Sequence, residues 1–132
     1  MNDMPTEIYN ALMANDELKE LVTGAKGIRV TYYDYGDTRD QTGLHLVIIP
    51  LKPPTPAVGG SDKELSVELT YQIDAVSANR KDVKRAQFLI KQILSEMGFS
   101  QLSDGLDDFL ENKTYVDARR YRMNTKLYQT NY

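Results

Sequence analysis

The feature that most constrains the fold is an alternating segment that leads directly into a helical pattern. From residue 65 to residue 75, apolar and polar side chains alternate, which is typical of a strand with one buried and one polar face. The apolar positions are Leu65, Val67, Leu69, Tyr71, Ile73 and Ala75. From residue 79 to residue 97 the apolar side chains instead recur with a helical period. Together the two patterns predict a sheet with a helix packed on its apolar face.

Both ends of this helix are marked in the sequence. Asn79 can cap the first turn, with Asp82 three residues later as in a capping box. Gly98 ends the helix, and Phe99 stands where a Schellman motif places its apolar contact. The expected core stripe is Val83, Ala86, Ile90, Ile93, Leu94 and Met97.

The N-terminal part of the chain predicts two helices followed mostly by loop. Residues 5 to 13 repeat apolar side chains at i and i+4, which indicates a first helix. Asn15 can cap a second, short helix that ends before Gly24. A short alternating run near residue 30 indicates a brief strand, and most of residues 27 to 43 is predicted as loop.

Two further strands are expected, one buried and one partly basic. Residues 44 to 51 are apolar on both faces, which indicates a strand covered on both sides. The last strand runs from about residue 115 to 128, and alternation sends Arg120 and Arg122 to one face. Glu68 and Asp74 could pair with that basic face if the two strands are neighbours.

Length and composition favour one domain over residues 1 to 132. A chain of 132 residues with 41% hydrophobic residues can bury one core. The predicted order is α-β-β-α-β, an α+β fold with a small, mainly antiparallel sheet and helices packed on one face. The net charge of -3 argues against general nucleic-acid binding, and we expect no secretory leader and no membrane span. The absence of cysteine excludes disulfides and thiolate metal sites.

The sequence contains no catalytic, cofactor-binding or metal-binding motif that we can identify. His45, the single histidine, lies in an apolar strand, where a structural role is expected. The acids between residues 34 and 40 lack the spacing of a calcium loop, and Gly59 and Gly60 lack a phosphate-binding pattern. A small enzyme stays an alternative, and it would need a deep polar pocket that holds His45 beside an acid.

A long loop rich in proline and glycine connects two of the predicted strands. It covers about residues 52 to 63, whereas most hairpin connections need only two to five residues. Prolines stiffen its first half towards an extended form, and glycines free its second half. We predict an assembly loop, mobile in the free subunit, made of Pro53, Pro54, Pro56, Val58, Gly59 and Gly60. A C-terminal tail is expected from about residue 128 to 132.

An exposed aromatic residue and segregated charges predict a subunit interface. Phe88 lies nearly opposite the core stripe of its helix, so its ring needs a cover. That cover is either residues 106 to 110 or the tail of the same chain, or else a neighbouring subunit. The helix is basic and the next segment acidic, which suits a head-to-tail contact between copies as well as an intramolecular or solvated arrangement. The candidate interface residues are Lys81, Lys84, Arg85, Phe88, Lys91, Asp104, Asp107, Asp108, Arg120 and Arg122.

Several of these stretches together resemble a known family. They are PTEIYNAL, the proline and glycine loop, ELTYQIDAVSANRKDVKRAQFLIKQIL, MGF and ARRYRMNTKLY. In this order they resemble small tail-completion proteins of phages and prophages of Gram-positive hosts, similar to tail terminators or tail-to-head joining proteins. The resemblance covers nearly the whole chain and is strongest from Glu64 to Gly98 and in the last strand.

The resemblance implies a structural virion protein rather than an enzyme, with no cofactor. It implies a homo-oligomeric ring, usually a hexamer, that caps the tail tube and offers a surface for head attachment. The implied partners are further copies, the tail tube protein and a head-completion or connector protein; DNA can pass through the ring without sequence-specific binding. Such a protein assembles in the host cytoplasm and ends in the tail or neck of the virion. The alternatives are a minor head or neck connector protein of the same fold, a small enzyme, or a host-interaction protein.

Overall fold

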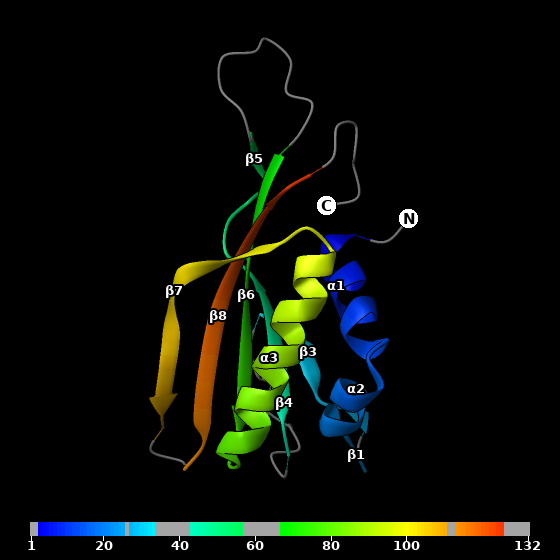
Figure 1. Cartoon of the computed structure of the whole chain (residues 1–132), viewed down its shortest axis with the longest axis vertical. Helices are drawn as coiled ribbons and strands as arrows, with labels where there is room; N and C mark the ends of the chain where they lie inside the picture. The colour runs from blue at the N-terminus through cyan, green and yellow to red at the C-terminus, as the bar shows by residue number, and fades with distance from the viewer. Residues whose placement is uncertain (1–2, 26, 34–42, 57–66, 111–112, 126–132) are drawn as a thin grey trace.

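The computed structural model describes residues 3–25, 27–33, 43–56, 67–110 and 113–125, in which helices pack on one face of a sheet (Figure 1). The helices are α1 (Met4–Met13), α2 (Asp16–Val22) and α3 (Arg80–Glu96). The sheet contains β3 (Val30–Tyr32), β4 (His45–Pro50), β5 (Thr55–Pro56), β6 (Val67–Ser77), β7 (Ser100–Phe109) and β8 (Tyr115–Asn124). A separate small hairpin is formed by β1 (Thr23–Gly24) and β2 (Gly27–Ile28).

The sheet is built around two long neighbouring strands, β6 and β8. They pair antiparallel from Glu68 opposite Asn124 to Ser77 opposite Tyr115. The strand order is β3-β4-β6-β8-β7, and β5 also pairs with β6. Within the described part of the chain, only β3 and β4 run parallel. The predicted α+β fold with a mainly antiparallel sheet is therefore confirmed.

The predicted ends of α3 are also confirmed. The Asn79 side chain accepts hydrogen bonds from the backbone N–H groups of Lys81 and Asp82, at 3.0 and 3.4 Å. At the other end Gly98 has a φ of 101°, in the left-handed region that favours glycine. The Phe99 N–H then donates to the Leu94 carbonyl at 2.9 Å, which is the long hydrogen bond of a Schellman motif. Residues next to each end of α3 therefore determine where the helix begins and ends.

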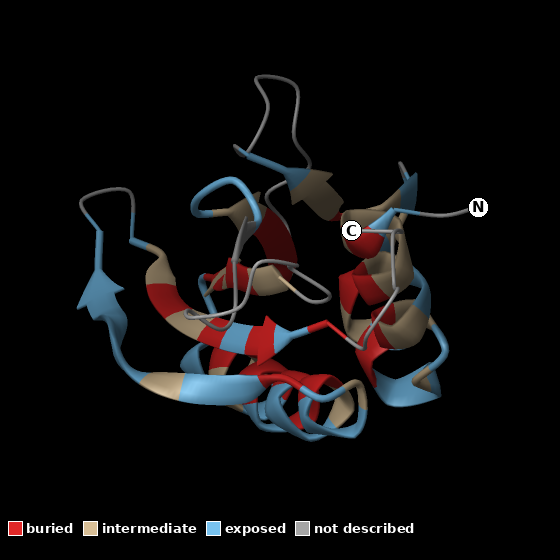
Figure 2. Ribbon diagram, turned by 90° about the horizontal axis from the view of Figure 1, so that it is seen from above, coloured by how far each residue is buried: buried red, intermediate tan, exposed pale blue. Residues whose placement is uncertain are grey.

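The core lies between the helices and the sheet, where Figure 2 shows buried segments of both facing each other. Alternate residues of β6 point towards the helices, as the sequence pattern predicts. The largest buried apolar side chains of this layer are Tyr121, Ile8, Leu12, Leu18, Leu44, Leu46, Ile48, Ile73, Ile90 and Leu94. In β4, Leu46 and Ile48 face the helices while His45 and Val47 point to the other side, and all four are buried. The prediction that this strand is covered on both sides is correct.

The predicted element order missed β7, which pairs with β8 at one edge of the sheet. Its ten residues are mostly exposed, so no alternation of apolar and polar residues identifies them as a strand. The pairing register shifts between Gln101 and Gly105, as at a β-bulge. A Cβ atom at Gly105 would lie 2.5 Å from the carbonyl oxygen of Ala118, so glycine allows the two backbones to approach.

Other predicted boundaries shift or fall outside the described residues. Residues 55 and 56 form a short strand, β5, where the sequence predicted only loop. The last strand ends at Asn124, and residues 126–132 lie outside the description, as do residues 57–66 and the acids between residues 34 and 42. Among the described residues, no helix has the length and hydropathy to cross a bilayer.

The acidic residues of β6 do not lie directly opposite the basic residues of β8, contrary to the expected charge pairing. The strands are neighbours, but the register sets Glu68 opposite Asn124 and Asp74 opposite Ala118. Glu68 instead binds Lys52, with 3.1 Å between Nζ and Oε1. Alternation predicts which residues share a face but does not fix the register between two strands.

Candidate assembly surface

Phe88 projects from the outer side of α3 and remains 52% exposed. The guanidinium carbon of Arg85 lies 5.3 Å from the centroid of its ring, within the range of a cation–π contact. Arg85 is itself held by two hydrogen bonds to the carboxylate of Glu17 on α2, at 2.5 and 2.8 Å. These bonds lower the pKa of Glu17 and raise that of Arg85. The ring is therefore oriented by its neighbours while half of its surface stays free.

Residues 106 to 110 do not cover Phe88, although the sequence offered them as one possible cover. Residues 106 to 109 belong to β7, and Leu106, Phe109 and Leu110 are themselves 54%, 50% and 37% exposed. The Phe109 ring packs against Tyr115 of β8, with 4.7 Å between ring centroids. The chain thus leaves a second group of large apolar side chains exposed, at the edge of the sheet.

A buried carboxylate joins α3 to β7 and β8. Asp117 accepts hydrogen bonds from Arg119 at 3.0 and 3.1 Å and from Lys84 at 2.9 Å, and its side chain is only 4% exposed. Lys84 also binds Asp107 on β7. Burial raises the pKa of Asp117, but the hydrogen bonds from Arg119 and Lys84 outweigh it and hold that pKa below its usual value of 3.8. Lys84 and Asp107, both predicted interface residues, therefore pair within one copy.

A series of side-chain hydrogen bonds crosses the face of the sheet that points away from the helices. Arg120 donates to Gln72 at 3.0 Å and to Asp104 on β7 at 2.8 Å. The Gln72 amide in turn donates to Asp74 at 2.8 Å. Arg119 points to the opposite face, as alternation predicts, because it contacts Asp117 under α3. Arg120 and Asp104 are therefore also paired within the subunit.

Gln87 is a structural residue that the sequence pattern did not single out. Its side chain is fully buried, and its amide nitrogen donates to the carbonyls of Ile73 at 3.1 Å and Asp117 at 2.6 Å. These bonds join α3 to both central strands. The sequence feature that could have identified Gln87 is its position directly after Ala86, at the edge of the apolar stripe of the helix.

Two complementary patches carry exposed apolar and charged side chains. The first, which we call the α3 face, consists of Lys81, Phe88 and Lys91 on the outer side of the helix. The second, which we call the β7 edge, consists of Asp104, Leu106 and Asp108, of which Asp104 is already paired with Arg120. Neither Lys81 nor Lys91 has an ion-pair partner among the described residues, and the Asp108 carboxylate accepts only the N–H of Phe109, at 2.8 Å. Arg122 is exposed on β8.

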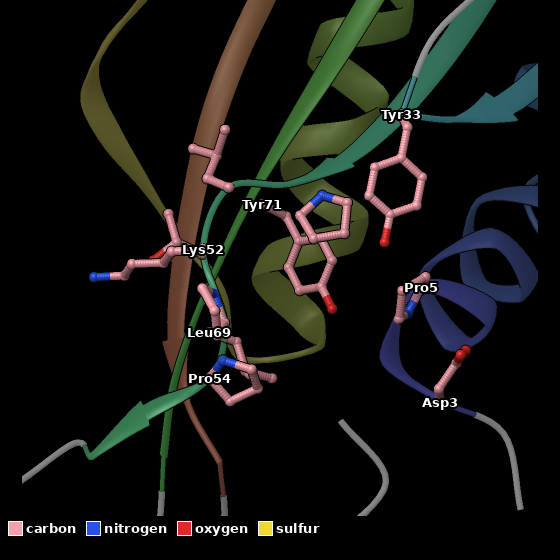
Figure 3. A pocket seen from close by; sticks show the side chains of 11 residues that line it. Asp3, Pro5, Tyr33, Lys52, Pro54, Leu69 and Tyr71 are labelled. Atoms are coloured by element: carbon pink, nitrogen blue, oxygen red, sulfur yellow. The ribbon is translucent and has the colours of Figure 1, made fainter.

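A groove of about 510 Å³ lies between the N-terminus of α1 and the segment that follows β4 (Figure 3). Pro53 and Pro54 of the predicted assembly loop line it, while Val58, Gly59 and Gly60 lie outside the described residues. Two tyrosines, Tyr33 and Tyr71, also line the groove. Tyr33 has a backbone φ of 71°, and burial raises the pKa of the Tyr71 hydroxyl to about 12. The groove therefore presents prolines and tyrosine rings.

The pocket that an enzyme would need is not found in the described cavities. His45 lines neither this groove nor a 250 Å³ cavity along β7 and β8, and its Nε2 lies 2.9 Å from the Thr31 hydroxyl. Within the described ranges, no group of three acidic or histidine side chains could hold a metal ion.

Comparison with known proteins identifies a shared fold. No protein-family model and no curated protein matches the sequence. A chain in the solved virion of a native gene transfer agent particle aligns with a TM-score of 0.62, over 92% of this chain and 93% of that chain, at 15% identity. A second solved structure aligns over 96% of this chain and 99% of its own at 10% identity, and its TM-score of 0.46 is too low to carry an argument. The protein therefore has the fold of a chain found in the virion of a gene transfer agent.

Proposed function

We propose that this protein is a non-enzymatic structural component of a phage or prophage virion. The supporting observation is the fold shared with the gene transfer agent chain, which extends over more than nine-tenths of both chains. Within that role, we propose a tail terminator or tail-to-head joining protein, a ring that caps the tail tube and contributes the head-attachment surface. This finer assignment follows the sequence resemblance to tail-completion proteins.

The uncovered surface supports an assembling protein rather than a monomer. Phe88 and Leu106 of the β7 edge are large apolar side chains that stay 52% and 54% exposed in the described subunit. The α3 face is basic and the β7 edge is acidic, so contact between different patches on successive copies is favoured over contact between like patches. A heterologous contact of this kind forms a ring where the rotation closes.

The proposed partners follow from this position in the virion. Other copies of the chain form the ring, the tail tube protein binds one side of it, and a head-completion or connector protein binds the other. The protein assembles in the host cytoplasm and remains in the virion. A net charge of -3 is compatible with DNA passing through the ring, because an acidic lining avoids attraction to phosphates.

Deletion and reconstitution in the producing phage or prophage test this function. Without the gene, heads and tails should form but not join, and adding the purified protein to the mixed extract should restore joined particles. Native mass spectrometry of the protein, alone and with tail tube protein, should show a closed ring. Complete virions from the deletion strain, or a strict monomer that does not bind the tube, would refute the proposal. Co-purification with heads instead of tails would assign the protein to the neck.

A further inference from the structure

We propose that the α3 face of one copy binds the β7 edge of the next copy, with Phe88 packed on Leu106 and Lys91 paired with Asp108. This inference rests on the proposed function, because it names the surfaces through which the ring would close. Both patches lie wholly among the described residues, and each presents an apolar side chain between two charged ones. On α3 the order is Lys81, Phe88, Lys91, and on β7 it is Asp104, Leu106, Asp108.

The three β7 side chains share one face of the strand. Leu106 lies opposite Ala118 and Asp108 opposite Val116, both of which point away from the helices. Asp104 belongs to the same side because it contacts Arg120 there. Among the described strands β7 pairs with β8 alone, so a second element can approach Leu106 and Asp108 from the other edge.

The spacing of the two patches is compatible. Lys91 follows Phe88 by three residues, which places their Cβ atoms about 5–6 Å apart on one side of the helix. Leu106 and Asp108 are two residues apart on a strand, which separates them by about 6.5–7 Å. A helix laid over the edge can therefore bring both pairs into contact at once.

Charge and exposure select this contact over the pairing of two β7 edges. Antiparallel pairing of two β7 strands would bring two sets of acids together, since each carries Asp104, Asp107 and Asp108, and like charges directly opposite are destabilising. The α3 face instead supplies cations that have no ion-pair partner in the described part of the subunit. The contact would also bury the ring of Phe88, which is 52% exposed in the free subunit.

Charge reversal and its compensation test the contact. Lys91→Glu and Asp108→Lys should each weaken self-association about 100-fold, because each places like charges against each other. An equimolar mixture of the two variants should associate again with strictly alternating subunits, since each interface then joins either the two wild-type residues or the two reversed ones. The double variant should also associate. Lys19→Glu, at an exposed position on α2, is the control and should behave as wild type.

Native mass spectrometry of isotope-labelled variants, with and without tail tube protein, provides the measurement. Circular dichroism confirms that each variant is folded, and Phe88→Ala should also lose association while its thermal stability is kept. If wild type forms rings and both charge variants do so equally well, the inference is wrong and the proposed function stands. Loss of association that neither the mixture nor the double variant restores also overturns the named pairing. If wild type never associates, even on the tail tube, the proposed function itself fails.

Discussion

Replacing Asp117 with asparagine should destabilise the subunit by about 2–3 kcal/mol. The side chain is 4% exposed and accepts hydrogen bonds from Arg119 and Lys84, so the substitution leaves two cations without their buried partner. Removing one member of a fully buried pair costs about 3–5 kcal/mol. The Lys84 and Arg119 side chains are 27% and 30% exposed, so water compensates part of that loss. For a domain of this size, the change corresponds to a drop in Tm of about 6–15 °C.

Asp107→Asn provides a matched control, because Asp107 binds the same Lys84 but its side chain is 65% exposed. An exposed pair contributes at most about 1 kcal/mol, so this variant should stay close to wild type. Urea denaturation followed by circular dichroism and tyrosine fluorescence measures both variants, since the chain has nine tyrosines and no tryptophan. Equal losses for the two variants would refute the assignment of Asp117 as the buried anchor of α3, β7 and β8.

The same variants predict a pH dependence. Because the pKa of Asp117 is held below its usual 3.8 in the folded protein, its contribution is present above that value and is lost as the pH falls through the folded pKa. The stability gap between wild type and Asp117→Asn should be constant near neutral pH and shrink below about pH 4. A gap that stays unchanged at low pH would show that the charge of Asp117 does not contribute.

Two further substitutions test how local sequence positions the assembly surface. Gly105→Ala places a Cβ atom 2.5 Å from the Ala118 carbonyl, so it should cost about 1–3 kcal/mol and increase hydrogen exchange along β7, whereas Ser103→Ala should do neither. Asn79→Ala removes the cap of α3 and should cost about 1 kcal/mol in urea denaturation, while Asn79→Asp keeps a capping oxygen and should leave the midpoint close to wild type. A Gly105→Ala protein with unchanged exchange, or an Asn79→Ala protein as stable as wild type, would contradict the respective reasoning.

Short-range signals predicted the local structure well. The ends of α3 depend on residues within one helical turn of each end, so Asn79 and Gly98 could be assigned their capping roles from the sequence. The alternation of β6 and the apolar run of β4 report burial directly, because side chains of a strand point to opposite faces. These elements were enough to predict the fold class.

Long-range partners could not be predicted in the same way. An edge strand that is exposed on both faces, such as β7, carries no periodic apolar signal. The sequence showed that basic residues cluster on the helix and acidic residues in the segment after it. It did not show which of these residues form ion pairs. Lys84 and Asp107 pair within the subunit because β7 returns beside β8 under the helix. Lys91 and Asp108 find no such partner in the described subunit.

The sequence by itself determined the fold class, the limits of α3 and most of its core stripe, the buried character of β4, and the presence of an unusually exposed aromatic at Phe88. Each of these depends on periodicity or on capping by near neighbours, which are local properties of the chain. Only the tertiary structure decided which charges are neutralised within one copy, and therefore which remain for a second copy. Ion pairs form between residues far apart in sequence, and their partners are set by strand register and helix placement.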